Sequence, residues 1–205
     1  MQSHAGLVGE GLLSGAVCGE IFASPSTGAV LEAIRYCGCS SSSGGVLLIV
    51  KNYTGDVLNF GLACERARSE GINVKMLVVA DDVALANARH PRGIAGTVLV
   101  HKICGAAASE GRSLDEIFEI GSTIVSKLRS CGVALTSPTH PTSSHLKNRI
   151  PDDEFEHGLG IHGEAGAAQL RQESLASIVD RMLSSLLMAE PDSTTPLCIL
   201  INNLG

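Results

Sequence analysis

A glycine-rich segment, residues 158–166, surrounds a single histidine, His162. Because glycine has no side chain, the backbone there can approach a small ligand closely and leave the imidazole accessible. A neutral imidazole is a competent nucleophile or base near neutral pH. The segment contains a formal G-x-G-x-x-G pattern, but the mainly acidic residues 152–156 precede it instead of an apolar strand, so a dinucleotide site is not predicted. The alternative is a tight turn in which His162 does no chemistry.

A lysine and a carboxylate follow the apolar run 46–50, in the short segment Lys51-Asn52-Tyr53-Thr54-Gly55-Asp56. Parallel α/β sheets bind ligands at the carboxyl ends of their strands. Lys51 could donate a hydrogen bond there, and Asp56 could accept one or act as a base. The alternative is a surface loop that turns at Gly55.

The arrangement of histidines and cysteines does not favour a metal ion. Two histidine pairs have a spacing of five, and one cysteine pair has no second pair to complete it: His140/His145, His157/His162 and Cys37/Cys39. Two histidines five residues apart in an irregular connector are not brought together as metal ligands by any regular backbone geometry. We therefore predict no metal site and treat His140 and His145 as solvated loop residues.

Three further charged or titratable residues have two interpretations each. His101 and Lys102 lie in a helical stretch of small residues, where they either face a phosphate or pack as a pair. Arg92, just before that stretch, either helps to bind an anion at the start of the helix or points to solvent.

The composition excludes several function classes. The 205 residues carry a net charge of −6, only 3% are aromatic, and no Lys/Arg cluster is present, so neither nucleic acid nor anionic lipid is an expected partner. No apolar run approaches the roughly 18 residues of a membrane span, and no secretory signal is visible. The seven cysteines are scattered over mostly apolar segments, which favours reduced, buried thiols and a cytoplasmic location.

Apolar runs alternate with helical patterns, which predicts an α/β fold with a mostly parallel sheet flanked by helices. The predicted strands are 46–50, 74–80, one that begins at 133, and 197–201; the predicted helices are 59–70, 96–110, one that a capping box opens at Ser113, and 174–188. We predict a first α/β unit over residues 1–138, a connector over 139–153, and the beginning of a second α/β unit over 154–205.

Three long motifs in the same order resemble the substrate-binding (DhaK) domain of dihydroxyacetone kinases, also called glycerone kinases. They are VLLIVKNYTGD at residues 46–56, GTVLVHK at 96–102 and GLGIHGE at 158–164. The likeness runs from about His4 to Gly205.

The resemblance implies a specific role for each of three residues. His162 would bond through Nε2, the tele nitrogen, to the carbonyl carbon of dihydroxyacetone as a hemiaminal, which selects ketones over glycerol. Lys51 and Asp56 would bind the substrate hydroxyls, and Asp56 would also act as the catalytic base. The implied reaction is ATP-dependent phosphorylation of glycerone to glycerone phosphate in glycerol and carbohydrate metabolism.

The resemblance also implies where the other components are. ATP and Mg²⁺ are expected outside this chain, on a nucleotide-binding DhaL-type domain in cis or in trans, and bacterial three-subunit systems use a phosphoryl relay instead. Family members often pair as homodimers, so dihydroxyacetone, the DhaL-type domain and a second copy are the implied partners.

The chain departs from the family pattern near its start. It begins close to Ser3-His4-Ala5-Gly6, so the family's upstream glycines and substrate-assisting histidine are missing, and we do not assign that role to His4. The family carries an apolar residue where His157 stands. We expect a domain truncated at both ends and inactive alone; the alternatives are a non-catalytic dihydroxyacetone-binding regulator and an inert fragment.

Overall fold

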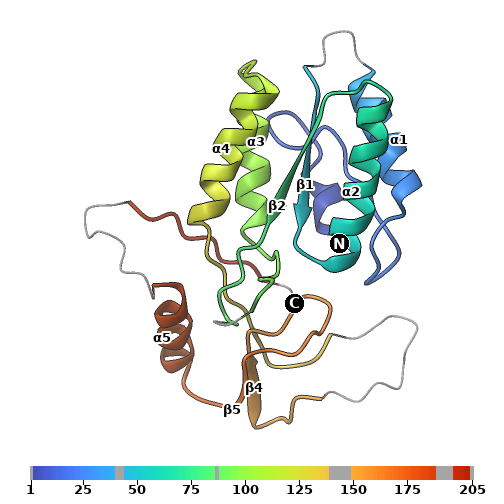
Figure 1. Ribbon diagram of the computed structural model, residues 1–205. Helices are drawn as coiled ribbons and strands as arrows, with labels where there is room; N and C mark the ends of the chain where they lie inside the picture. The colour runs from blue at the N-terminus through green and yellow to red at the C-terminus, as the bar shows by residue number, and fades with distance from the viewer. Residues whose placement is uncertain (1, 40–43, 86–87, 139–148, 188–195, 204–205) are drawn as a thin grey trace. The chain divides into compact units, whose positions relative to one another are not determined.

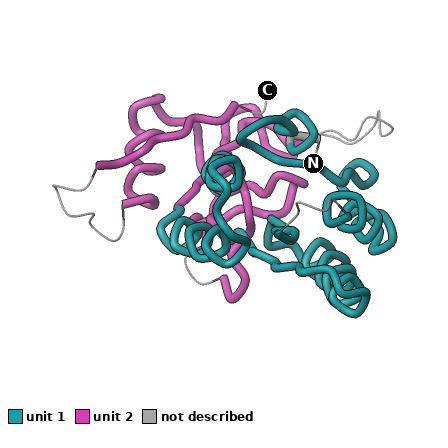
Figure 2. Tube along the Cα trace, turned by 90° about the horizontal axis from the view of Figure 1, so that it is seen from above, with its two compact units in different colours: residues 1–80, 96–128 teal, residues 81–95, 129–205 magenta. Residues whose placement is uncertain are grey.

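The computed structural model describes residues 2–39, 44–85, 88–138, 149–187 and 196–203. Two compact units are present (Figure 2). Unit 1 comprises residues 1–80 and 96–128, and unit 2 comprises residues 81–95 and 129–205. The predicted domain boundaries at 138 and 154 stay a prediction.

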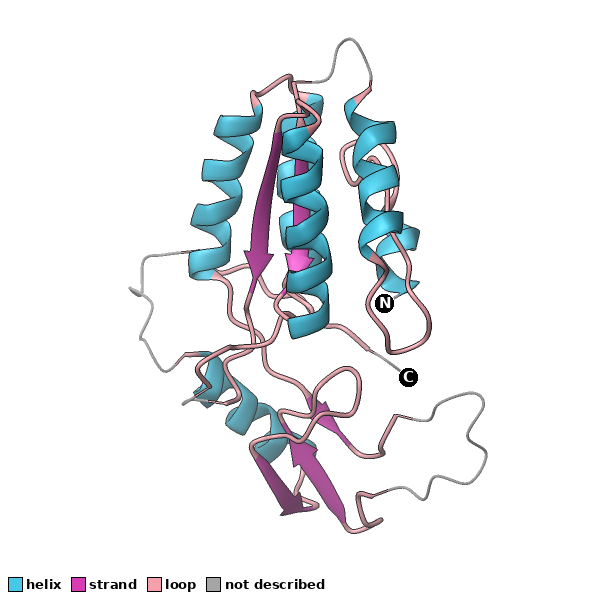
Figure 3. Ribbon diagram, turned by 45° about the vertical axis from the view of Figure 1, so that its right-hand side comes forward, coloured by secondary structure: helices cyan, strands magenta, loops and turns pink. Residues whose placement is uncertain are grey.

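Unit 1 is built on two parallel strands, β1 (Val46–Lys51) and β2 (Val74–Val79), paired in register from Val46 opposite Val74. Four helices cover them: α1 (Thr27–Gly38), α2 (Thr54–Ser69), α3 (Thr97–Ser109) and α4 (Leu114–Lys127). Helices α1 and α2 lie on one side of the strands and α3 and α4 on the other (Figures 1 and 3). Both predicted strands and the predicted helices of this region are confirmed.

The alternation of side chains along the strands explains this layering, because successive residues of a strand point to opposite faces. Val74 is buried in a cluster with Ile34 of α1 and Ala63 of α2. Leu77 and Val79 face the other way and are buried with Val100 of α3. A strand buried on both faces reads as a continuous apolar run, which is why β1 and β2 could be recognised in the sequence.

The helix ends follow local side-chain chemistry. Ser113 accepts a hydrogen bond from the backbone N–H of Glu116, and the Glu116 side chain accepts one from the backbone N–H of Ser113, so the predicted capping box is confirmed. Helix α2 begins at Thr54, five residues before the predicted start at Asn59. The first residues of the chain, where no element was predicted, form a 3₁₀ helix over Gln2–Leu7.

Unit 2 contains an antiparallel sheet in the order β3-β4-β5: β3 (Val133–Ala134), β4 (Glu154–His157) and β5 (Ala168–Arg171). The prediction of a mostly parallel sheet is therefore wrong for the strands described in this unit. The sequence analysis missed β4 because Phe155, its one apolar residue, lies between two glutamates, so the segment has no apolar run. Phe155 between them is completely buried, and Glu156 and His157 are also buried.

The carboxyl-terminal predictions have mixed outcomes. The predicted helix 174–188 is confirmed as α5 (Leu175–Leu186). The predicted buried strand 197–201 is wrong, because these residues form no regular element and Ile199 and Ile201 are 77% and 90% exposed. No described strand pairs with this segment, and an unpaired strand leaves its backbone groups without partners. Most of the predicted connector, residues 139–148, lies outside the described residues.

Two sequence-wide predictions can be compared with the structure. Within the described ranges, none of the helices has both the length and the apolar character needed to cross a membrane. The cysteines are all free thiols, but they are not uniformly buried as predicted: Cys64 and Cys104 are buried, whereas Cys18, Cys39 and Cys198 are exposed.

Candidate functional site

Lys51 and Asp56 stand where β1 passes into α2 in unit 1. Lys51 is the last residue of β1, and Asp56 lies in the first turn of α2 instead of in a loop. A carboxylate is favourable in the first turn, where the helix dipole is positive. Asp56 is only 5% exposed, and its Oδ1 has no hydrogen-bond partner among the described residues. A buried acceptor of this kind costs free energy, which is typical of a group that is kept for a function.

A buried histidine pair lies in the same unit. His4 Nδ1 and His101 Nε2 are 2.8 Å apart and share a hydrogen bond. Burial, followed by the positive charge of Lys51, lowers the pKa of His4 to about 4. Burial also lowers the pKa of His101 to about 4, with smaller contributions from charge repulsion by His4 and Lys51. Both imidazoles are therefore neutral at pH 7. His101 is a packed residue, whereas Lys102 is exposed, so of the two interpretations of His101 the structure supports packing.

In unit 2 the glycine-rich segment forms the loop between β4 and β5. Gly158 and Gly163 adopt positive φ angles of 79° and 83°, which residues with a side chain rarely adopt. The backbone N–H of Gly163 donates to the carbonyl of Gly160 over 2.9 Å, closing a turn around His162. The loop ends where the backbone N–H of Gly166 donates to the Glu156 carboxylate.

Glu164 holds His162 through two hydrogen bonds. The His162 Nδ1 atom lies 2.9 Å from Glu164 Oε1, and the backbone N–H of His162 donates to Glu164 Oε2 over 3.0 Å. Burial alone would raise the pKa of Glu164, but hydrogen bonds from the His162 side chain and from backbone N–H groups outweigh it and lower the pKa to about 2. Glu164 is therefore an ionised acceptor at pH 7. In the neutral form of the ring, the hydrogen-bonded proton is then on Nδ1 and the lone pair is on Nε2.

The loop does not leave the imidazole as open as its glycines predicted. The His162 side chain is only 15% exposed. Its glycines serve instead to form the turn and to let neighbouring side chains approach the backbone.

Arg92 belongs to unit 2, and it is buried instead of pointing to solvent. Its side chain is 10% exposed and pairs with Asp82, which is 3% exposed. The prediction that Arg92 points to solvent is therefore wrong, and the prediction that it helps to bind an anion stays a prediction. Residues 81–95, which include Arg92, fold with unit 2.

His157 has a sulfur neighbour. Its Nε2 lies 3.5 Å from Cys131 Sγ and 3.3 Å from Ser185 Oγ. Burial and the charge of Arg181 lower the pKa of His157. Across the residues that the structure describes, no three His, Cys, Asp or Glu side chains gather as a metal-binding group. His140 and His145 lie outside the described residues.

The structure adds three residues that the sequence analysis did not assign to the site: Glu164, Asp82 and Glu156. Each contacts the 158–166 loop or the arginine beside it. Asp82 carried a signal in the sequence, since Asp81-Asp82 directly follows a predicted buried strand. Glu164 lies in the glycine-rich segment two residues after His162, and Glu156 lies in an acidic run.

Together these features define an α/β protein with two polar centres, Lys51 and Asp56 in unit 1 and a carboxylate-oriented histidine in unit 2. Residues 2–205 match the model of the Dak1 domain, so the chain belongs to the Dak1 domain family.

Named relatives agree with this membership. The chain is 48% identical over 203 residues to the dihydroxyacetone kinase of Citrobacter freundii, covering 99% of this chain and 36% of that protein. The crystal structure of that kinase in complex with AMP-PNP and Mg²⁺ has a TM-score of 0.87 at 48% identity, over 92% of this chain and 35% of the other. A dihydroxyacetone kinase operon co-activator, Dha-DhaQ, has a TM-score of 0.84 at 37% identity, over 91% of this chain and 57% of the other. The chain thus spans about a third of the length of the kinase it matches.

Proposed function

We propose that this chain is a dihydroxyacetone-binding domain in which His162 captures the substrate ketone as a hemiaminal. The observation that carries the proposal is the hydrogen bond of 2.9 Å between His162 Nδ1 and the ionised Glu164 carboxylate. A proton held on Nδ1 makes Nε2 the nucleophilic nitrogen, as the tele adduct of the family requires.

The addition consumes no co-reactant. The Nε2 lone pair forms a bond to the carbonyl carbon while the carbonyl π bond breaks and its electrons move to oxygen. The Nδ1 proton passes to Glu164 and from there, directly or through solvent, to the new alkoxide, which becomes a hydroxyl. Glu164 returns to the carboxylate form. The adduct is neutral overall. Glycerol has no carbonyl group and is excluded by this step.

Lys51 and Asp56 are proposed to bind the two hydroxyl groups of the ketone. The lysine ammonium donates to a substrate oxygen, and the aspartate accepts a hydrogen bond from a substrate hydroxyl. The buried Oδ1 of Asp56, which has no partner among the described residues, supports this acceptor role. The same carboxylate is the proposed base for the hydroxyl that is phosphorylated.

The complete reaction is proposed to be phosphorylation of dihydroxyacetone by a longer protein of which this domain is the substrate-binding part. The relative solved with AMP-PNP and Mg²⁺ supports ATP and Mg²⁺ as its cofactors. The described residues of this chain do not fit that role, since they offer no carboxylate or histidine cluster for a metal. As the family resemblance implies, we propose that nucleotide binding belongs to a DhaL-type domain, and we expect no steady ADP release from this chain alone.

Carbon-13 NMR of labelled dihydroxyacetone tests the capture step. Wild-type chain should produce a hemiaminal carbon signal that His162→Ala abolishes, whereas the exposed control His90→Ala should retain it. Labelled glycerol should give no adduct with any variant. Equal adduct signals from wild type and His162→Ala would remove His162 from the mechanism.

A non-catalytic regulator is the second candidate function, and the likeness to a kinase operon co-activator favours it. Both candidates bind dihydroxyacetone, so turnover separates them. The complete protein, supplied with a DhaL-type partner, ATP and Mg²⁺, should form glycerone phosphate if it is a kinase. Binding of dihydroxyacetone without turnover would support the regulator.

A further inference from the structure

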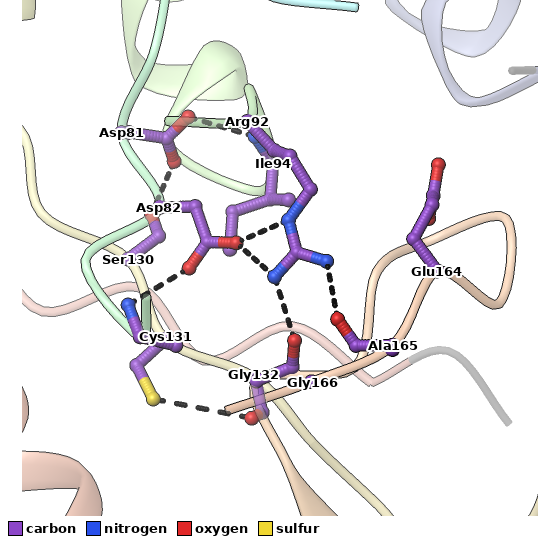
Figure 4. Close-up of polar contacts among 12 residues, drawn as sticks. Asp81, Asp82, Arg92, Ile94, Ser130, Cys131, Gly132, Glu164, Ala165 and Gly166 are labelled. Carbon is purple, nitrogen blue, oxygen red and sulfur yellow. Dashed lines mark hydrogen bonds and ion pairs between the residues drawn. The ribbon is translucent and has the colours of Figure 1, made fainter. Parts of the chain in front are cut away.

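A buried ion pair lies beside the His162 loop in unit 2. The Arg92 guanidinium donates from Nε to Asp82 Oδ2 over 2.8 Å, and its Nη2 lies 2.6 Å from the same oxygen (Figure 4). The other oxygen of Asp82 accepts a hydrogen bond of 3.0 Å from the backbone N–H of Ala84. The carboxylate is thus held from both sides, and it fixes the plane of the guanidinium.

The same guanidinium also contacts both ends of the loop that carries His162. Its Nη2 donates to the carbonyl of Gly158 over 2.6 Å. Its Nη1 donates to the carbonyl of Ala165 over 3.4 Å (Figure 4). In the middle of the loop, a Cβ atom on Gly160 would lie 2.8 Å from Arg92 Nη1 and even closer to Glu164. The loop therefore rests on the arginine, and Gly160 is needed for that close approach.

We propose that Arg92, oriented by Asp82, is a positioning residue that holds the 158–166 loop in the shape in which Glu164 reaches His162. The proposal rests on the proposed function of His162 for its effect on substrate capture, whereas its effect on loop structure stands alone. Arginine suits the task because its planar fork donates several hydrogen bonds in fixed directions. Lysine keeps the charge but has no planar fork.

The sheet around the loop has supports of its own. β4 and β5 are paired directly from Glu154 opposite Arg171 to His157 opposite Ala168. Glu156 accepts from the backbone N–H of Gly166 and pairs with Arg149. A weakened Arg92 contact should therefore loosen the loop without separating the strands, and β4 and β5 provide an internal reference.

The variants Arg92→Lys and Asp82→Asn test the proposal in the full chain. Without any ligand, Arg92→Lys should increase amide hydrogen exchange in residues 158–166 at least about 10-fold while β4 and β5 exchange as in wild type. The ¹⁵N signals of the His162 ring should change from a single tautomer to a mixture. Capture of labelled dihydroxyacetone should weaken at least about 10-fold. Asp82→Asn should act in the same direction, and Arg181→Gln, which breaks the exposed Arg181–Glu173 pair, should change none of these readouts.

Two results would overturn the proposal. The first is wild-type loop exchange and a wild-type His162 ring spectrum in Arg92→Lys. The second is a uniform loss of protection in β4, β5 and the loop, which would make the ion pair a general support of unit 2. If wild-type chain fails to capture dihydroxyacetone although Arg92→Lys selectively loosens the loop, the proposed function fails and the positioning role stands.

Discussion

In unit 1 the polar side chains stand at the ends of regular elements, whereas in unit 2 His162 stands on a loop held by other side chains. Lys51 and Asp56 are placed by β1 and α2, and those elements are placed by apolar packing on both faces of two strands. His162 is placed by Glu164 and by the buried Arg92–Asp82 pair. The positions of Lys51 and Asp56 thus depend on the hydrophobic pattern of the sequence, whereas the position of His162 depends on the geometry of hydrogen bonds.

The largest effect should come from removing core volume in unit 1. Ile34 is 1% exposed, so Ile34→Ala should lower the free energy of unfolding by about 2–5 kcal/mol because it leaves a cavity. Leu58→Ala, at a position that is 66% exposed on α2, should change it by less than about 0.5 kcal/mol. Urea unfolding followed by circular dichroism measures both. Similar losses in the two variants would contradict the account of how unit 1 positions its residues.

The next effect concerns the carboxylate that orients His162. Glu164→Gln should weaken dihydroxyacetone capture about 10–100-fold, by analogy with the losses seen when a carboxylate that orients a metal-binding histidine is changed. The change removes the charge that holds the proton on Nδ1. Glu173→Gln, in the exposed pair with Arg181, is the matched control and should capture as wild type does. If Glu164→Gln captured dihydroxyacetone as well as wild type does, the Glu164 carboxylate would not be needed for the reaction of His162, and its role would be limited to the structure of the loop.

The neutral pair His4 and His101 of unit 1 should give the free energy of unfolding a dependence on pH, with a smaller change per pH unit than the effects above. The pKa of His4 and that of His101 are lowered from 6.5 to about 4 by burial. The unfolded chain therefore takes up protons below pH 6.5 that the folded chain does not bind until about pH 4. This contribution to stability is complete above pH 6.5 and is lost as the pH falls toward 4, by up to about 1.4 kcal/mol per pH unit for each imidazole.

Chemical denaturation at a series of pH values measures that slope. His101→Gln should make the stability less dependent on pH between 4 and 6.5, while the exposed His90→Gln should leave the slope unchanged. The account of this pair would be wrong if wild-type chain and His101→Gln lost stability in parallel on acidification.

The smallest effect on stability is predicted at Asp56, where function and stability should have opposite signs. Asp56→Asn removes a charge from a position that is 5% exposed, so it should leave stability unchanged or raise it by up to about 1 kcal/mol. Binding of dihydroxyacetone should weaken in the same variant. Thermal unfolding and the NMR titration measure the two quantities, and a destabilised variant with normal binding would assign Asp56 a purely structural role.

The sequence predicted unit 1 better than unit 2 for a physical reason. Continuous apolar runs, a capping box and glycine-ended helices are local signals, so β1, β2 and α4 could be located from them. β4 carries its apolar residue Phe155 between two glutamates and was missed. Its pairing with β5 also depends on segments that are distant from each other in the sequence.

The candidate site divides in the same way. The types of Lys51, Asp56 and His162 and the glycines around them were sufficient to single them out. Arg92 could not be linked to the loop from the sequence, because it lies 66 residues before Gly158, to whose carbonyl it donates. Glu164 was within reach, since it is two residues after His162, but its role depends on a turn that the sequence alone does not specify.

The tautomer of His162 tests the central claim most directly. In chain labelled with ¹⁵N in its histidine rings, a long-range ¹H–¹⁵N spectrum at pH 7 distinguishes a proton on Nδ1 from a proton on Nε2. Because the Glu164 carboxylate accepts from Nδ1, the account predicts that His162 shows the Nδ1–H form alone. A ring protonated on Nε2, or on both nitrogens, would have no lone pair for the ketone at that position and would contradict it.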